Sequence, residues 1–115
     1  MRDLKEQRCV PCEGGTKPLD AGEVQKYITL VKTWRVVDNK KIEKSFTFVD
    51  FKHAVGFINE IADVAEFEGH HPDINLHNWN KITITLSTHA IKGLSQNDFI
   101  LAAKIDQIIR DAEAK

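Results

Sequence analysis

The 115-residue sequence has little of several things that would mark a specialised class of protein. It holds two cysteines, three prolines and one methionine, and no apolar run approaches the about 20 residues of a membrane span. Its 16 basic and 17 acidic side chains leave a formal charge of -1, so no positive excess attracts nucleic acid or an anionic membrane. The charged N-terminus also lacks the apolar core of a secretory signal. We therefore expect a cytoplasmic protein with no nucleic acid and no membrane among its partners.

What remains is a composition that supports one hydrophobic core. Hydrophobic residues make up 42% of the chain and include six phenylalanines and two tryptophans. Domains commonly hold about 100–150 residues, which leaves no room for a second core. Residues 8–18 contain glycine and proline and precede the first amphipathic pattern. We therefore predict a flexible N-terminal segment over 1–18 and a folded domain over 19–115.

The two cysteines, Cys9 and Cys12, form a CxxC pair inside that first segment. This spacing occurs in redox motifs and in zinc sites, but a redox motif needs a βαβ context and a zinc site needs a second pair of ligands. Neither context is visible, which favours a reduced, incidental pair over a functional one.

Three segments carry apolar residues at helical spacing. Two of them, 20–31 and 50–69, each begin with an aspartate suited to an N-cap, and the second ends at a glycine. The third begins near Ser95, where Ser95 and Asp98 have the spacing of a capping box. For the middle helix we predict an inward stripe that leaves out Phe57 and Val64 and consists of Phe51, Val55, Ile58, Ala62 and Ala65.

Alternating polar and apolar residues predict four strands, over 34–38, 41–49, 73–78 and 81–88. The resulting order, α-β-β-α-β-β-α, contains two hairpins and no βαβ unit. It predicts an α+β fold in a single domain: a four-stranded antiparallel sheet with the helices packed on one face. Because such a sheet has exposed edges, we also expect a homodimer or a homotetramer.

The strongest chemical signal is a group of four histidines between residues 70 and 89. His70 and His71 follow the predicted helix end, and Pro72 disfavours helical backbone at His71, so both lie in a loop from which they can enter a cleft. His89 ends the last predicted strand and by parity shares its polar face. An imidazole donates or accepts a proton near neutral pH, which suits a reaction that needs both an acid and a base.

No motif of a covalent nucleophile accompanies these histidines. Ser87 and Thr88 stand in no recognisable nucleophile motif, and no glycine-rich phosphate loop is present. The sequence therefore favours proton transfer without a covalent intermediate. The main alternative is a zinc site built from the three histidines with Glu66, which is disfavoured because adjacent histidines chelate one ion with difficulty.

Ordinary structural roles are predicted for several neighbouring residues. Asp98 fits a helix cap better than a substrate contact. Trp34 and Trp79 fit packing positions, because large aromatic side chains serve burial first. His53 and His77 are predicted at the surface, and Glu66 is predicted to be solvated.

A longer pattern, E-x3-H-H-P-x6-W-x9-H-x8-D, spans residues 66–98 and resembles the signature of the pterin-4a-carbinolamine dehydratases. The similarity extends from Trp34 to Asp106 and includes the stretches FTFVDFKHAVGFINEIA and TITLSTH. One position departs from the family pattern, because Gly69 stands where many relatives carry Asn or Asp. The members of the pattern here are Glu66, His70, His71, Pro72, Trp79, His89 and Asp98.

This resemblance implies that the chain removes water from a 4a-hydroxytetrahydropterin to give a quinonoid dihydropterin, within tetrahydrobiopterin recycling. It implies no metal and no organic cofactor, and a small-molecule pterin as the partner. His70 and His89 would be the acid–base pair, with the two roles not assigned between them, and His71 would orient the pterin as a third catalytic residue. The implied substrate-binding residues are His70, His71, Pro72, Ser87, Thr88, His89 and Asp98.

The resemblance also implies an alternative role. In animals, members of this family act as dimerisation cofactors for a homeodomain transcription factor through contacts between helices. An apolar patch on an exposed helix face would favour that role. Phe57 and Val64, predicted to lie off the inward stripe, are candidates for such a patch or for self-assembly.

Overall fold

The computed structural model describes residues 3–10 and 17–113. The predicted order of α-helices and strands, α-β-β-α-β-β-α, is confirmed, and each strand ends up to two residues earlier than predicted. Two short 3-10 helices, η1 and η2, are added to it. The bounds in chain order are η1 Leu4–Glu6, α1 Ala21–Ile28, β1 Arg35–Val37, β2 Lys41–Thr47, α2 Phe51–Glu68, β3 Asp73–His77, β4 Lys81–Leu86, η2 His89–Ile91 and α3 Gln96–Glu113.

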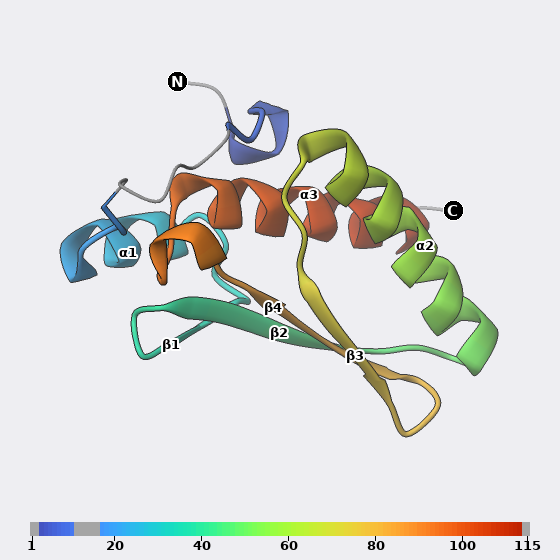
Figure 1. Ribbon diagram of the computed structural model, residues 1–115. Coiled ribbons are helices and arrows are strands. Elements are labelled where there is room, and N and C mark those ends of the chain that lie inside the picture. The colour runs from blue at the N-terminus through green and yellow to red at the C-terminus, as the bar shows by residue number, and fades with distance from the viewer. Residues whose placement is uncertain (1–2, 11–16, 114–115) are drawn as a thin grey trace.

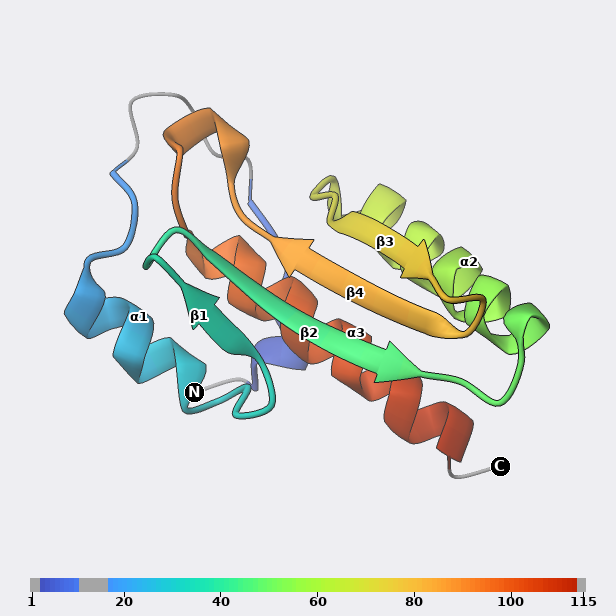
Figure 2. The same cartoon turned by 90° about the horizontal axis from the view of Figure 1, so that it is seen from below.

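The strands form one antiparallel sheet in the order β1-β2-β4-β3 (Figure 2). At its centre β2 pairs with β4, with Ile42 opposite Leu86. Successive side chains of a strand point to opposite faces, so Ile82 and Leu86 share one face with Ile42, and all three are fully buried. Thr83 and Thr85 point to the other face. The predicted alternation of apolar and polar residues along β4 therefore places the apolar side chains in the core and the threonines on the opposite face of the sheet.

All three α-helices cover the apolar face of the sheet, with α3 between α1 and α2 (Figure 1). This confirms the predicted α+β class with helices on one face. The inward side of α3 is fully buried at Phe99, Leu101 and Ile105. Burial of each such side chain stabilises the fold by about 1.5–3 kcal/mol relative to exposure. Within the described ranges no helix is long and apolar enough to cross a membrane.

The two tryptophans lie in different environments. Trp34 is 3% exposed, and its Nε1 donates to Asp106 of α3 over 3.1 Å, so the predicted packing role is confirmed. Trp79 is 60% exposed and occupies the β3–β4 turn with a φ of 56°, so the packing role predicted for it is wrong in this chain. A hairpin turn needs left-handed backbone, and that need places Trp79 at the turn tip, away from the core.

The first hairpin turn also uses left-handed residues. Asp38 and Asn39 have φ values of 54° and 55°, the conformation of a type I′ turn, in which aspartate and asparagine are common. The predicted strands 34–38 and 41–49 left Asn39 and Lys40 between them, so the turn is centred one residue earlier than those ranges imply. Its tip points toward the end of the sheet at which β4 finishes (Figure 2).

Helix ends follow the predicted caps. Asp20 and Glu23 form a reciprocal capping box at the start of α1, with the Glu23 N–H donating to Asp20 over 2.8 Å. Asp50 accepts from the N–H of His53 at the start of α2 over 2.7 Å. Gly69 ends α2 in the left-handed conformation, with a φ of 67°. Only the end of α1 differs, since it stops at Ile28 instead of 31.

The stripe predicted to face inward on α2 is wrong in part. Phe51 and Ala62 are exposed and Val55 is half-buried, whereas Ile58 packs against the core and Ala65 is buried. The face that packs inward is offset around the helix and consists of Ala54, Phe57, Ile61, Ala65 and Glu68. Two apolar stripes coexist on α2, and helical periodicity alone cannot choose which of them meets the sheet.

The N-terminal segment contributes structure that the sequence did not predict. Residues 3–10 include η1, whose Leu4 is 7% exposed and belongs to the core. Cys9 is half-buried and its N–H donates to Glu68 at the end of α2. Cys12 lies outside the described residues, and the predicted boundary between 18 and 19 stays a prediction.

Candidate functional site

His70 lies at the point where α2 ends and the chain turns toward β3. The left-handed Gly69 redirects the backbone, and the N–H of His70 donates to Ala65 O over 3.3 Å. This turn brings the His70 side chain inward, where it is 12% exposed. Its Nε2 lies 2.7 Å from Oδ1 of Asp98, a residue 28 positions later in the chain.

Asp98 lies in the first turn of α3 and is completely buried. Its Oδ2 accepts from the N–H of Ser95 over 2.9 Å, which confirms the predicted cap. The same oxygen accepts from Oγ1 of Thr88 over 2.8 Å, while Oδ1 contacts His70. Asp98 therefore caps α3, as predicted, and also holds His70, a contact that the sequence did not predict.

Thr88 and Ser95 complete this buried polar network. Their hydroxyl oxygens lie 2.7 Å apart, and both residues are buried. The backbone of Thr88 also pairs with Gly93, with its N–H donating to Gly93 O over 2.8 Å. These bonds fix the loop between β4 and α3. A fully satisfied buried network of this kind restricts the orientation of its members, here including His70.

His89 lies in this loop and not in a strand. β4 ends at Leu86, and His89 begins the 3-10 helix η2, so the strand position predicted for it is wrong. The bridge between Thr88 and Gly93 ends the regular pairing and reverses the chain. His89 is nevertheless exposed, as the parity argument expected, although a turn and not strand parity exposes it.

His71 points to the surface, and its ring is 59% exposed. Its Nε2 pairs with Oε2 of Glu66, one turn back on α2. The Glu66 side chain is 75% exposed, in line with the predicted solvation, but it also orients His71. An exposed pair of this kind adds little stability, so its value lies in positioning the ring.

One cavity brings these residues together. It has a volume of about 250 Å³ and includes five residues predicted for the site, whereas Pro72 and Asp98 do not line it. Asp98 can therefore act on a bound molecule only through His70 and Thr88. The lining residues are Val10, Gly69, His70, His71, Ser87, Thr88, His89, Ala90 and Asn97.

Val10 and Asn97 are site residues that the sequence analysis missed. The N–H of Val10 donates to Oδ1 of Asn97 over 3.0 Å, and Nδ2 of Asn97 donates to Val10 O over 2.5 Å. This pair of bonds fastens the N-terminal segment to α3 beside the cavity. The two residues are 87 positions apart, and no pattern in the sequence links them.

The arrangement can hold and move protons. A carboxylate accepts hydrogen bonds and does not donate them, so an ionised Asp98 fixes the proton of His70 on Nε2 and leaves Nδ1 as the nitrogen available for exchange. The tautomer follows from this network. His89, on the other side of Ser87 and Thr88, supplies a second imidazole to the same cavity. Two imidazoles at one cavity can serve as an acid and a base.

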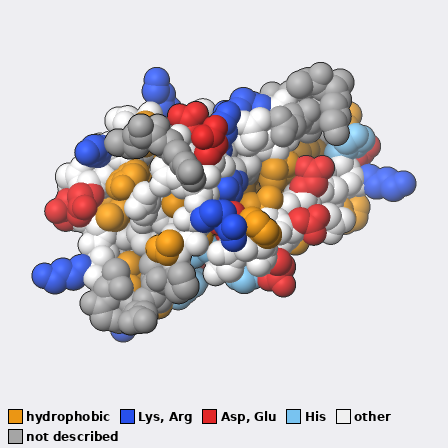
Figure 3. Space-filling view, turned by 90° about the horizontal axis from the view of Figure 1, so that it is seen from above, with side chains coloured by type: hydrophobic (Ala, Val, Ile, Leu, Met, Phe, Trp, Pro, Cys, Tyr) orange, Lys and Arg blue, Asp and Glu red, His pale blue; other side chains and the backbone are white. Residues whose placement is uncertain are grey.

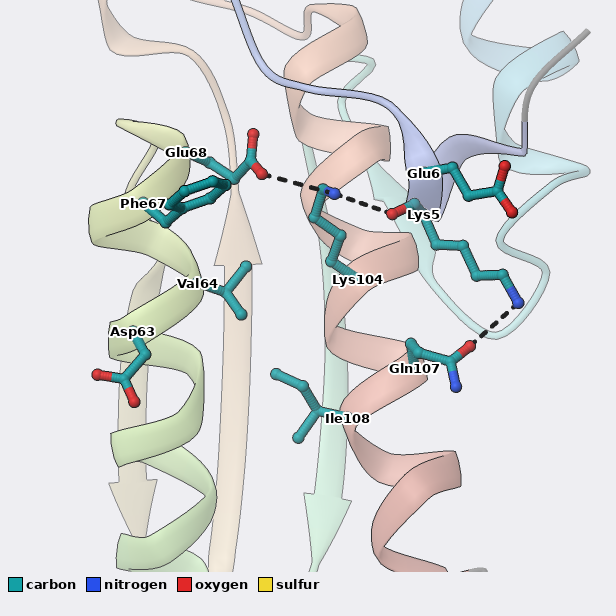
Figure 4. Close-up of a pocket in the computed structure, with 9 residues that line it drawn as sticks. All are labelled: Lys5, Glu6, Asp63, Val64, Phe67, Glu68, Lys104, Gln107 and Ile108. Carbon is teal, nitrogen blue, oxygen red and sulfur yellow. Dashed lines mark hydrogen bonds and ion pairs between the residues drawn. The ribbon is translucent and has the colours of Figure 1, made fainter.

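A larger cavity of about 600 Å³ lies between α2, α3 and η1 (Figure 4). Glu68 is its most buried titratable side chain, and its carboxylate lies 3.5 Å from Nζ of Lys104 and 3.3 Å from Nε of Arg8. Burial raises the pKa of Glu68, but the hydrogen bond from the Cys9 N–H, Lys104 and Arg8 together hold that pKa below its ordinary value. This cavity contains no histidine, and its carboxylate fastens the N-terminal segment.

The remaining histidines lie apart from the site. His53 is exposed and pairs with Asp50 at the start of α2, and His77 bonds to Thr83 on the open face of the sheet. Among the residues that the structure describes, no three side chains of the His, Cys, Asp or Glu types are placed to hold one metal ion. On the helical face acidic and basic side chains are interspersed (Figure 3).

Comparison with known proteins identifies relatives over most of the chain. The family model described as pterin 4 alpha carbinolamine dehydratase matches residues 17–108. A protein of Alkaliphilus metalliredigens is 46% identical over 108 residues, covering 93% of this chain and 96% of its own. One of Azoarcus sp. is 41% identical over 112 residues, covering 96% and 95%. Both are named as pterin-4-alpha-carbinolamine dehydratases, with the activity marked in the names as inferred.

Two solved structures share the fold. A Brucella melitensis protein called a transcriptional coactivator/pterin dehydratase superposes with a TM-score of 0.74 at 32% identity, covering 80% of this chain and 98% of its own. A pterin dehydratase-like protein described as a RuBisCO assembly factor in the alpha-carboxysome gives a TM-score of 0.56 at 26% identity, covering 66% and 88%. The match of the family model over residues 17–108, together with relatives above 40% identity, shows that this chain belongs to the pterin-4-alpha-carbinolamine dehydratase family.

Proposed function

We propose that this chain dehydrates a 4a-hydroxytetrahydropterin to a quinonoid dihydropterin by acid–base catalysis with His70 and His89. The observation that carries the proposal is the cavity they share, in which His70 is held at 2.7 Å by the fully buried Asp98. A buried carboxylate that contacts an imidazole fixes the orientation of the ring. Family membership supports the reaction class.

The proposed reaction moves two protons and breaks one bond. One imidazolium gives its proton to the 4a-hydroxyl, and the C4a–O bond breaks with release of water. The other imidazole takes the proton from N5, and the N5–H electron pair forms the C4a=N5 double bond. The two roles are divided between His70 and His89. The enzyme ends with the same total number of protons and needs no redox cofactor and no metal.

The other site residues have supporting roles in this proposal. His71, oriented by Glu66, binds an edge of the pterin ring, and Ser87 lines the floor between the two catalytic imidazoles. Thr88 and Asp98 position His70 from behind the cavity wall. Pro72 disfavours helical backbone at His71 and does not line the cavity, so its part in binding is indirect.

We further propose that the chain assembles as a homodimer or homotetramer and works in tetrahydrobiopterin recycling. The exposed or half-buried flank of α2, formed by Phe51, Val55, Ile58 and Ala62, supports self-assembly, as does the open edge of β3. The cytoplasmic location expected from the sequence stays a prediction.

A protein-interaction role is the second candidate. The names of the two solved relatives attribute a coactivator function to one and an assembly function to the other, both of which involve binding to other proteins. The patch predicted at Phe57 and Val64 is wrong, because Phe57 is buried and Val64 packs against the core, but the apolar flank of α2 that includes Phe51 would serve such a role. Dehydration remains the better supported function, because a protein-binding role does not require a buried carboxylate that orients a histidine in a cavity.

The direct test is a stopped-flow assay of 4a-hydroxytetrahydropterin dehydration. We expect the protein to accelerate dehydration over buffer, and His70→Ala and His89→Ala each to lower kcat by about 10²–10⁴-fold. His53→Ala is the matched control, because His53 does not line the cavity and pairs with Asp50 at the start of α2. No acceleration, or unchanged rates in both cavity variants, would contradict the proposal. Stoichiometric zinc that is lost in His89→Ala would support the metal alternative.

A further inference from the structure

A second cavity adjoins the histidine site. It has a volume of about 270 Å³ and shares Ser87, Thr88 and His89 with the first cavity. The shared residues form the wall between them, so a molecule that passes His89 leaves the first cavity and enters the second. The other residues that line it are Asp38, Lys40, Lys41, Lys92 and Gly93.

Two turns with left-handed backbone build this second cavity. The β1–β2 turn has positive φ at Asp38 and Asn39 and presents Lys40 and Lys41. The turn after η2 has a φ of 54° at Lys92, which faces the same cavity. A lysine in this conformation costs free energy relative to glycine, so the turn places a cation where a glycine would be less strained.

The three lysines give this cavity a concentrated positive charge. Three ammonium groups and one carboxylate, that of Asp38, leave +2 (3 − 1), on a chain whose formal charge is -1. Within the described residues none of the three ammonium groups has a hydrogen bond or an ion pair, whereas Lys44 pairs with Asp106 and Lys104 with Glu68. An uncompensated group of cations at a concave site attracts an anion.

The chemistry of the pterin ring connects this charge to the proposed reaction. The reacting atoms, C4a and N5, are neighbours, and N5 is bonded to C6, which carries the variable substituent of a pterin. While the two imidazoles act on C4a and N5, the C6 substituent must extend away from the ring past one of them. The His70 side of the first cavity is lined by Gly69 and Asn97 and has no lysine among its lining residues, whereas His89 also lines the second cavity, beside the three lysines.

We propose that the lysine cavity binds an anionic group, a phosphate or a carboxylate, carried on the C6 substituent of the pterin. This inference rests on the proposed function, because it takes the ring to lie between His70 and His89. It makes a pterin with a charged side chain the preferred substrate over one with a neutral side chain. Lys40, Lys41 and Lys92 are then specificity residues, and they take no part in the proton transfer.

Binding of oxidised pterins, measured by isothermal titration calorimetry, tests this. The probes are neopterin, which has a neutral side chain, neopterin 3′-monophosphate, and pteroylglutamate, which carries carboxylates. We expect the wild-type protein to bind neopterin monophosphate about tenfold or more tightly than neopterin at low salt, with the ratio falling toward one as salt screens the charges. If only the monophosphate, or only pteroylglutamate, binds more tightly than neopterin, that result identifies whether the cavity binds a phosphate or a carboxylate.

The decisive variant is the triple substitution Lys40→Gln, Lys41→Gln and Lys92→Gln. It should bring the ratio of the two dissociation constants close to one, whereas the matched control, Lys26→Gln, Lys32→Gln and Lys52→Gln, removes three exposed lysines elsewhere and should leave the ratio unchanged.

A ratio near one in the wild-type protein, or an unchanged ratio in the decisive variant, overturns the anion site. If neopterin binds and dehydration is accelerated in that case, the proposed function survives. If no pterin binds and no dehydration is seen, both fail.

Discussion

Substituting Asp98→Asn tests how the buried carboxylate controls His70. Asp98 accepts from Ser95 N–H and Thr88 Oγ1 through Oδ2 and contacts His70 through Oδ1. An asparagine that keeps the first two bonds through its oxygen must turn its NH₂ group toward Nε2 of His70. Because that group donates, Nε2 must accept, and the ring proton moves to Nδ1. His70 is then held in the wrong tautomer for exchange at the cavity.

The substitution should affect activity more than stability. We expect kcat to fall by about 10²–10⁴-fold, the usual contribution of a positioned acid or base. The free energy of unfolding should fall by about 1–3 kcal/mol, because hydrogen bonds to a charged acceptor are replaced by neutral ones inside a fully buried network. Stopped-flow dehydration and urea unfolding measure the two effects on the same samples.

Asp106→Asn is the matched control. Asp106 lies on the same helix, is also largely buried, and accepts from Trp34 Nε1 over 3.1 Å and Lys44 Nζ over 2.8 Å, but it contacts no histidine. It should lose comparable stability and keep its kcat. The reasoning is refuted if Asp98→Asn retains wild-type kcat, or if both variants lose kcat to the same extent.

Two further predictions concern stability. Glu68→Gln should destabilise the fold by about 1–3 kcal/mol at pH 7, because a neutral oxygen replaces the charged acceptor of the Cys9 N–H and an NH₂ group, which donates, replaces the oxygen that faces Lys104. Since the pKa of Glu68 is lowered on folding, its contribution is present above the ordinary value of 4.5 and is lost as the pH falls below it, so variant and wild type should converge in urea titrations at acid pH. A difference that persists unchanged in acid would contradict this. Gly93→Ala should lower the free energy of unfolding by about 1–3 kcal/mol, because the added Cβ would lie 2.8 Å from Cβ of Pro18. An unchanged midpoint of urea unfolding would contradict this and show that the segment around Pro18 moves aside at little cost.

The sheet was predictable because its sequence signal is strictly periodic. In β4 the isoleucines and the leucine alternate with threonines, and a shift of one residue would bury the threonines. The caps of α1 and α2 were predictable for a similar reason, since aspartate at Asp20 and Asp50 satisfies free N–H groups locally. Local chemistry and strand parity therefore account for most of the fold.

The face of α2 was not predictable, because the helix has two apolar stripes. The one through Phe51 and Val55 has the spacing of a core stripe, but Ala54 and Phe57 form the side that meets the core. The choice depends on how α2 docks on the sheet, which is a tertiary property. Trp79 was misplaced for the same kind of reason, since the geometry of a turn overrides its preference for burial.

The sequence pattern identified the histidines of the site, but the contacts that these histidines make depend on the fold. The bond between His70 and Asp98 joins two helix ends that are 28 residues apart, and no local rule predicts it. Val10 lines the cavity next to Asn97, to which it is hydrogen-bonded, and their separation of 87 positions hides this contact from any local pattern. The strand position of His89 was wrong because strand parity was extended past Leu86, where the Thr88–Gly93 bridge ends the ladder.

The division of the acid and base roles between His70 and His89 can be measured most directly as the pH dependence of kcat/KM for dehydration. We expect a bell-shaped profile, with one histidine required protonated and the other unprotonated. We also expect His70→Ala to remove one limb of the bell-shaped profile and His89→Ala to remove the other. Each variant then keeps a profile with a single slope. A bell that survives intact in either variant, or a flat profile in the wild-type protein, would contradict it.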